Sequence, residues 1–228
     1  MPNETTKRFV GALAGLALLL IISAGIHGAF SQLLLLTTFA ACALFASARK
    51  VRIPGLEGIF SLNFLVLLVA AQSLPLIELQ LVAAACAVLQ GYWKALRRPQ
   101  WIQTVFNAAN MVVSISAAKW AMESAVVFPN PWRFLSVGVA AATYYLVNTG
   151  LTATVLVLVT DGGFRDVWHR WSFHALPHYL LGSVIVSAWI LLPADRMLQN
   201  FLLLGVLLAA MGCVLRRAVP QGEIQKPT

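Results

Sequence analysis

Charged side chains are scarce in this chain of 228 residues: 11% are Asp, Glu, Lys or Arg, whereas 60% are hydrophobic. A soluble protein must cover its surface with polar groups, and one or two cores of this size could not hide so much apolar side chain. Several apolar runs also reach the roughly 20 residues that cross a bilayer as a helix. The shortage of charge therefore argues against a soluble domain and predicts an all-α, polytopic transmembrane helix bundle.

Cysteine is rare as well, and its placement argues against two kinds of site. Cys42, Cys86 and Cys213 each lie within an apolar run, without a CxxC spacing or a nearby set of histidines. Cysteines in such surroundings serve as small apolar residues. No disulfide, no metal site and no cofactor is therefore expected.

Catalytic motifs are missing too. The sequence has no GxSxG, HExxH, GxGxxG or Walker A pattern, and no apolar segment carries a pair of carboxylates. The DGG at 161–163 is more simply a helix stop built on glycine. A non-enzymatic protein is therefore expected. The remaining enzymatic alternative is an intramembrane lipid enzyme that uses His174 or His178.

The chain does contain a series of apolar segments that alternate with short polar connections. Eight of them are predicted to span the membrane, at residues 9–27, 31–48, 60–76, 78–95, 101–122, 133–160, 174–193 and 198–215. They form one transmembrane bundle over residues 1–215, followed by a short cytoplasmic tail at 216–228. Pro75 marks the least certain division, where it either kinks one long segment or separates two.

The positions of the basic residues predict which side of the membrane each connection faces. Thirteen of the 16 Lys and Arg fall on one side of the membrane, and only Lys119, Arg133 and Arg196 fall on the other. This positive-inside pattern predicts a multi-pass protein of the bacterial inner membrane with both termini in the cytoplasm. The net charge of +8 is then a topology signal, with anionic lipid headgroups and not nucleic acid as its partner. A secretory signal peptide would resemble residues 7–29, but its removal would upset the charge pattern.

Two predicted spans carry polar side chains at helical spacing. The candidate residues are Gln103, Asn107, Asn110 and Ser114 of the fifth span, Tyr145, Asn148 and Thr152 of the sixth, and Asn63 of the third. Steps of three and four residues place each set on one face of its helix. Because an amide in hydrocarbon costs free energy unless it is bonded, these faces are expected to point toward protein or water.

Two interpretations of these polar faces stay open. Transmembrane amides commonly hold helices together through hydrogen bonds, and this is the simpler interpretation. Alternatively, the faces line a polar cavity that binds a small ligand or passes a solute. No charged residue lies in the middle of a predicted span, which argues against a proton-coupled pump.

Two connections are also informative. Residues 161–173 combine an aromatic stripe with charged residues, which predicts an amphipathic helix in the cytoplasmic headgroup region. His174 and His178 are one helical turn apart, but no acidic or cysteine partner makes them a metal site. In the connection 49–64, Pro54 and two glycines break any helix, which leaves a plain basic loop or a short extended piece.

Three stretches resemble the N-terminal multi-helix membrane regions of bacterial signalling proteins that carry diguanylate cyclase or HD-GYP phosphodiesterase output domains. They are VRIPGLEGIFSLNFLVLLVA at 51–70, FNAANMVVSISAA at 106–118 and YYLVNTGLTATVLVL at 144–158. The resemblance covers about residues 30–215. It implies a sensor-type bundle that binds a small ligand or a partner protein, with Asn63, Asn107, Asn110 and Asn148 at matching positions.

The resemblance ends where an output domain would begin, because only a short tail follows Arg217. It therefore does not imply turnover of cyclic di-GMP by this chain. The overall pattern is also similar to the substrate-capturing membrane subunits of vitamin importers. A solute transporter or capture subunit, working with a transport partner protein, is therefore the alternative to a sensor that works with a signalling partner.

Overall fold

The chain folds into an α-helical bundle. The computed structural model describes residues 3–28, 33–48, 50–52, 59–61, 63–93, 95, 98–125, 134–160, 162–190 and 205. Within these residues the elements are α1 (Glu4–His27), α2 (Leu33–Ala48), β1 (Lys50–Arg52), β2 (Ile59–Ser61), α3 (Asn63–Ala70), α4 (Leu76–Tyr92), α5 (Trp101–Ser124), α6 (Phe134–Thr160) and α7 (Phe164–Ile190). One short hairpin is the only strand structure in the described part, so the predicted α-helical class is confirmed.

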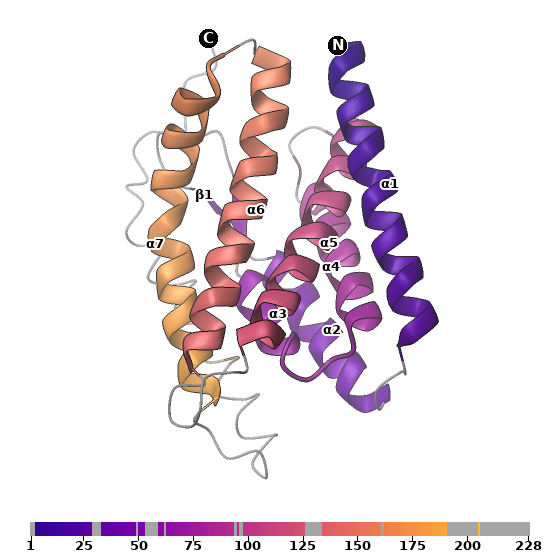
Figure 1. The fold of residues 1–228 in the computed structure, drawn as a ribbon, viewed down its shortest axis with the longest axis vertical. Coiled ribbons are helices and arrows are strands. Elements are labelled where there is room, and N and C mark those ends of the chain that lie inside the picture. The colour runs from indigo at the N-terminus through magenta and orange to yellow at the C-terminus, as the bar shows by residue number, and fades with distance from the viewer. Residues whose placement is uncertain are drawn as a thin grey trace.

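The helices arrange themselves around α5. It packs against α1, α4 and α6, and α6 in turn packs against α7. Figure 1 shows the result, with α1 at one edge of the bundle, α6 and α7 side by side at the other, and α4 and α5 between them. Helices α1 and α6 are each long and apolar enough to cross a membrane, and α2 and α4 are apolar but shorter.

Helix α3 is much shorter than the predicted span at 60–76. It has eight residues, and a turn over 71–74 follows before Pro75 stands at the N-cap of α4. Pro75 therefore separates two helices and does not kink one. Every side chain of α3 is buried, because α2, α4, α5, α6 and α7 all contact this short helix. The last predicted span, 198–215, lies outside the described residues except at position 205.

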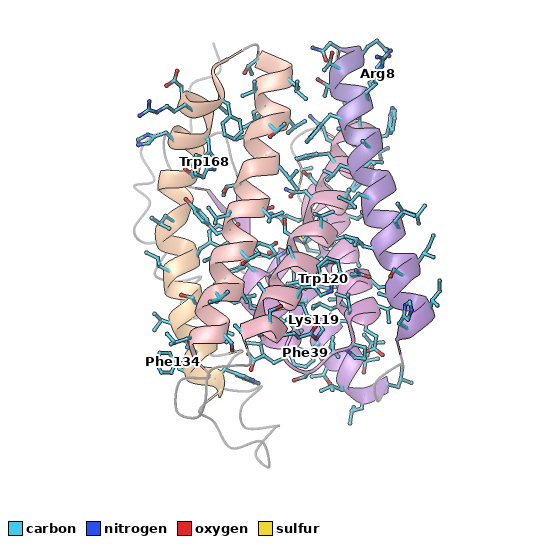
Figure 2. The ribbon with its side chains drawn as sticks, viewed as in Figure 1. Arg8, Phe39, Lys119, Trp120, Phe134 and Trp168 are labelled. Atoms are coloured by element: carbon cyan, nitrogen blue, oxygen red, sulfur yellow. The ribbon has the colours of Figure 1, made fainter. Side chains whose placement is uncertain are left out.

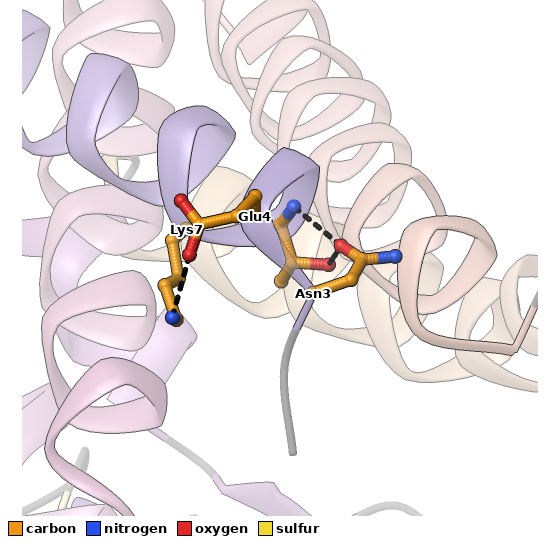
Figure 3. A network of polar contacts seen from close by, with 4 residues as sticks. Asn3, Glu4 and Lys7 are labelled. Atoms are coloured by element: carbon orange, nitrogen blue, oxygen red, sulfur yellow. Dashed lines mark hydrogen bonds and ion pairs between the residues drawn. The ribbon is translucent and has the colours of Figure 1, made fainter.

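The start of α1 is fixed by its own capping residue. The Asn3 side chain accepts a hydrogen bond from the Thr6 backbone N–H at 2.8 Å, and Glu4 lies in the positive first turn. Glu4 also pairs with Lys7 at 2.8 Å, as Figure 3 shows. Asn3 Nδ2 and Thr6 Oγ1 both donate to the Leu158 carbonyl, at 3.0 and 3.2 Å. This carbonyl lies in the last turn of α6, where intrahelical partners run out, so the cap joins α1 to α6.

Lys119 anchors the opposite end of the bundle. Figure 2 shows Arg8 and Trp168 toward one end and Lys119, Trp120 and Phe134 toward the other. Lys119 Nζ donates to the Ala71 carbonyl at 2.8 Å and pairs with Glu123 at 3.2 Å. Because Ala71 immediately follows α3, the ammonium group satisfies a carbonyl at the negative end of that helix.

Two connections can be compared with their predictions. Helix α7 runs without interruption from Phe164 to Ile190, so the expected interfacial segment at 161–173 and the following span form one continuous helix. Gly162 and Gly163 lie between α6 and α7, as expected of a helix stop. Of the two forms predicted for the connection from α2 to α3, the structure has the short extended piece and not the plain basic loop. The connection contains the antiparallel pair β1–β2, with Val51 opposite Phe60.

Candidate functional site: a polar cluster between α5, α6 and α7

Four of the eight candidate residues meet in the middle of the bundle. Asn110 Nδ2 of α5 donates to Asn148 Oδ1 of α6 at 2.8 Å and lies 3.3 Å from Thr152 Oγ1. Ser114 Oγ donates to Asn110 Oδ1 at 3.2 Å. Asn110 and Ser114 are one helical turn apart on α5, and Asn148 and Thr152 are one turn apart on α6, so two facing stripes form the contact. We call these residues, with Tyr179, the polar cluster.

Tyr179 extends the polar cluster to α7. Its hydroxyl accepts a hydrogen bond from Asn148 Nδ2 at 2.8 Å, so the Asn148 amide bonds to α5 through its oxygen and to α7 through its nitrogen. The Tyr179 ring meets the Phe64 ring of α3 edge to face, with centroids 4.5 Å apart, and the Tyr145 ring at 5.2 Å. Residues of α3 and α6 therefore meet at this side chain of α7, and α5 is linked to it through Asn148.

Two further hydrogen bonds join α6 to α7 on the side toward the α6–α7 turn. The Tyr145 hydroxyl donates to the Ser172 carbonyl at 3.1 Å, and Trp168 Nε1 donates to Thr149 Oγ1 at 3.2 Å. Tyr145 is thus beside the polar cluster and not part of its amide network. Together with the bond from Asn148 to Tyr179, these contacts fix the register of α7 against α6.

Asn63 lies next to the polar cluster at the start of α3. Its side chain is buried, and its Nδ2 donates to Met111 Sδ at 3.5 Å. A thioether is a weak acceptor. Its partner Met111 follows Asn110 of the polar cluster on α5. The next residue on α3, Phe64, packs against Tyr179 of the polar cluster. Asn63 therefore lies beside the polar cluster.

Gln103 and Asn107 lie apart from the other candidates, on an exposed part of α5. Gln103 is the third residue of the helix, and its Oε1 accepts from the Gln100 backbone N–H at 3.0 Å. Together with the bond in the other direction this completes a capping box at the helix start. The stripe predicted as one continuous face is therefore divided: its first two residues are exposed and its last two are buried.

Sequence reasoning missed a second buried polar contact, between α4 and α5. Gln80 Nε2 donates to Ser116 Oγ at 2.9 Å, and both residues are completely buried. The Gln80 Oε1 atom is buried without a hydrogen-bond partner. Glu78, the third residue of α4 after the N-cap Pro75, is also buried. The signal available was the Glu and Gln in the stretch IELQ, which are surrounded in the sequence by apolar residues.

Tyr179 and Trp168 were also missed as members of the site. Both belong to the segment whose histidines attract attention, and their partners lie 31 and 19 residues away on α6. His169 is exposed, and the side chains of His174 and His178 are outside the described set. Among the described residues no three His, Cys, Asp or Glu side chains form a group that could hold a metal ion.

The polar cluster has the chemistry of recognition. Its members are amides and hydroxyls, which donate and accept hydrogen bonds but do not ionise near neutral pH. Such groups can exchange partners with a polar ligand, since each hydrogen bond broken between helices is replaced by one to the ligand. They supply neither an activated nucleophile nor a general base matched to pH 7.

Comparisons with known proteins place the chain in a family. No curated protein and no solved structure matches it. The MASE9 family model matches residues 16–218, which include nearly all of the helical bundle. MASE denotes a membrane-associated sensor domain, and such domains are non-catalytic. The match agrees with the predicted membrane location, with the predicted sensor class and with the expectation that the protein is not an enzyme. The chain belongs to the MASE9 family of membrane-associated sensor domains.

Proposed function

We propose that this protein is a multi-pass helical bundle of the bacterial inner membrane that binds a small polar ligand, or a partner protein, and reports binding through α7. The polar cluster is the observation that carries the proposal. It joins α5, α6 and α7 through hydrogen bonds of 2.8 Å from Asn110 to Asn148 and from Asn148 to Tyr179. A ligand that replaces either bond changes how α7 is held.

The exposed surface supports a membrane-spanning orientation. Trp101 and Trp120 are both exposed near the two ends of α5. They are 19 residues apart, or about 28 Å along a helix, which matches the roughly 30 Å hydrocarbon core with an aromatic residue at each interface. Large apolar side chains such as Leu19 of α1 and Val184 of α7 point outward between these levels, as lipid-facing residues do.

The described basic residues support both termini being cytoplasmic. Lys7 and Arg8 at the start of α1, Arg98 before α5 and Arg165 at the start of α7 are all exposed. These helix starts lie at the end of the bundle where Figure 2 shows Arg8 and Trp168. Anionic headgroups of the cytoplasmic leaflet are the expected partners of this charge. Lys119, near the other end, is already engaged by Ala71 and Glu123.

Sensing requires two arrangements whose balance the ligand shifts. In the described arrangement the Asn110 amide donates to Asn148 and accepts from Ser114, and the Asn148 amide donates to Tyr179. A ligand carrying carbonyl, hydroxyl or amide groups would compete for those atoms and loosen the contact of α6 with α7.

Two more hydrogen bonds, which involve Tyr145 of α6 and Trp168 of α7, join these helices toward the N-terminal end of α7. In the proposed orientation that end is cytoplasmic. A change in the contact of α6 with α7 would therefore reach the cytoplasmic end of α7. A signalling partner, such as the cyclase and phosphodiesterase proteins that the sequence resembles, would detect it there.

A transporter or substrate-capture subunit would use the same polar residues as a passage. Membership of a sensor family favours binding without flux. Reconstitution into proteoliposomes separates the two functions: accumulation of a solute that the protein binds would replace the sensor proposal by the transport alternative.

The proposal is tested by ligand-dependent thermal stabilisation of the purified protein in detergent. A panel of small polar metabolites is screened against the wild type, Asn110→Leu and Asn107→Leu. Asn110→Leu should abolish any ligand-dependent rise in Tm, whereas Asn107→Leu should retain it because Asn107 is exposed and outside the polar cluster. Equal ligand responses in the two variants would show that binding occurs elsewhere.

A further inference from the structure

Helix α7 continues through a proline. Pro177 lies near the middle of Phe164–Ile190 and has no backbone N–H, so the Phe173 carbonyl lacks the donor that it would have in a regular helix. A proline inside a helix is one of the few causes of a sharp kink. The interrupted hydrogen bonding divides α7 into a first segment, 164–173, and a second segment, 177–190, which can change direction relative to each other.

The first segment is held to α6 by side chains. The Tyr145 hydroxyl donates to the Ser172 carbonyl at 3.1 Å, one residue before the carbonyl that Pro177 leaves without its donor. Nearer the helix start, Trp168 Nε1 donates to Thr149 Oγ1 at 3.2 Å. Since both bonds depend on a side chain, the first segment can leave α6 while its own helical hydrogen bonds stay intact.

The second segment is held more closely. Asn148 Nδ2 donates to the Tyr179 hydroxyl at 2.8 Å. One turn farther along α7, a Cβ atom at Gly182 would lie 2.6 Å from Phe64 Cε1, so the backbone of α7 comes very near to α3. Helix α3 is itself buried on all sides. Bending near Pro177 should therefore move the first segment and leave the second in place.

Tyr145 contacts α7 on both sides of the proline. Its hydroxyl bonds to the Ser172 carbonyl of the first segment, and its ring packs edge to face against the Tyr179 ring of the second, with centroids 5.2 Å apart. One rigid side chain therefore fixes the two segments relative to each other. A Tyr179 side chain that lost its bond to Asn148 would no longer hold the Tyr145 ring, and with it the hydroxyl, in this position.

We propose that Pro177 is a hinge in α7 and that Tyr145 is the latch that keeps the hinge closed. The inference rests on the function proposed above, because it describes how binding at the polar cluster is passed on. A ligand that takes the Asn148 amide from Tyr179 frees the Tyr145 ring. The bond to Ser172 is then lost, and the first segment turns away from α6 about the hinge.

The size of this motion follows from the length of the first segment. Residues 164–173 extend about 14 Å, so a change of about 20° in the kink moves the helix start by about 5 Å. Arg165, Asp166 and His169 are exposed on this segment. A cytoplasmic partner would therefore meet the same charged and polar side chains in a new position, while the second segment keeps its contact with α3.

Distances between pairs of spin labels test the hinge in the full-length protein in lipid nanodiscs, without a ligand. In a cysteine-free background, Thr5→Cys on α1 is the fixed reference. Its distance to Arg165→Cys reports the first segment of α7, and its distance to Val184→Cys reports the second. All three positions are exposed, so the labels point away from the packed interior.

Tyr145→Phe opens the latch, because it removes the hydroxyl and keeps the ring. It should add a second distance for the Arg165 label, shifted by about 5 Å, and leave the distance of the Val184 label unchanged. Pro177→Ala in the same protein supplies the missing N–H and should remove the second distance. Tyr92→Phe, at an exposed tyrosine of α4, is the matched control and should change neither distance.

Tyr179→Phe opens the latch in a second way. It removes the acceptor of the Asn148 amide, as the ligand is proposed to do, and should produce the same second distance as Tyr145→Phe. If neither variant produced it, Tyr145 would not be a latch and the inference would be overturned. Either variant that folds is sufficient for the measurement.

Two further results would overturn the hinge and leave the sensor proposal standing. Equal shifts of the Arg165 and Val184 labels would show that α7 moves as one rigid helix. A second distance that persists with Pro177→Ala would show that the helix bends elsewhere. None of these measurements uses a ligand, so the hinge can fail while ligand-dependent stabilisation through Asn110 is observed. Failure of that stabilisation, with the expected distances, would instead leave the hinge and remove the polar cluster as its trigger.

Discussion

The two halves of α5 use the same kinds of polar side chain in different ways. Gln103 and Asn107, in the half toward the helix start, are exposed, and Gln103 bonds to the backbone of its own helix start. Asn110 and Ser114, on the same predicted stripe, are buried and bonded to each other, and Asn110 also bonds to α6. The comparison teaches that spacing assigns residues to a face, whereas the neighbouring helix decides whether that face is an interface.

The largest effect is expected from breaking the buried half at its centre. Asn148→Leu removes the acceptor of the Asn110 amide and the donor to the Tyr179 hydroxyl at once. Leaving buried polar groups unpaired costs about 2–3 kcal/mol of unfolding free energy, toward the upper end of what interhelical hydrogen bonds contribute in membranes. Unfolding in mixed micelles with increasing SDS measures the loss.

Asn107→Leu is the matched substitution in the exposed half. An exposed position without an interhelical contact should change the unfolding free energy by less than about 0.5 kcal/mol. Equal losses for Asn107→Leu and Asn148→Leu would remove the distinction between the two halves of α5.

The second effect concerns the packing that holds Tyr179 in place. A Cβ atom at Gly182 would lie 2.6 Å from Phe64 Cε1 and 2.9 Å from Leu65 Cδ2. The Phe64 ring has little room to move, because the Tyr144 and Tyr179 rings are 5.1 and 4.5 Å away. Gly182→Ala should therefore push α7 from α3 and cost about 1–2 kcal/mol, with altered near-UV circular dichroism from the displaced tyrosines.

Gly138→Ala on α6 controls for the general effect of replacing a helical glycine. No atom lies within 4 Å of a Cβ at Gly138, so alanine should be neutral or stabilise by up to about 1 kcal/mol through its helix propensity. A stable Gly182→Ala protein with unchanged tyrosine signals would show that the contact of α7 with α3 is loose.

The divided stripe marks the limit of what the sequence predicts. Apolar length predicted most of the helices, because it follows from the hydrocarbon thickness and needs no knowledge of neighbours. The periodicity also selected Asn110, Ser114, Asn148 and Thr152 correctly as residues of one face on each helix. That these faces meet each other, and that Tyr179 completes the contact from α7, depends on tertiary packing that periodicity does not contain.

The short α3 was hidden from sequence for a similar reason. Its apolar run continues through the turn at 71–74, so the hydrophobic pattern gave a longer helix than the chain forms. For the connection before it, the proline and the two glycines excluded a helix but did not decide between a plain loop and a short extended piece. Burial by five surrounding helices, together with Lys119 on the Ala71 carbonyl, supports an eight-residue helix that could not persist alone in water.

A smaller effect is expected in the exposed half. Gln103→Ala removes one side of the capping box at the start of α5, which leaves the Gln100 N–H to the solvent or headgroups. The cost should be about 0.5 kcal/mol, at the low end for caps because the site is exposed. Amide hydrogen exchange should rise in the first turn of α5 only. Faster exchange at Asn110 or beyond would show that the two halves of α5 are coupled.

The smallest change in unfolding free energy is expected at the contact between Gln80 of α4 and Ser116 of α5, which can be compared with the polar cluster. Gln80 donates to Ser116, but its own Oε1 is buried without a partner. Gln80→Met keeps an unbranched side chain of similar volume and removes that unsatisfied oxygen, while Ser116 keeps its bond to the Val112 carbonyl at 2.7 Å. One hydrogen bond is lost and one desolvation penalty is relieved, so the two terms nearly cancel and the unfolding free energy should change by less than about 0.5 kcal/mol. A loss as large as that of Asn148→Leu would mean that a water molecule bonds to Gln80 Oε1, and the contact of α4 with α5 would then be as fully bonded as the polar cluster.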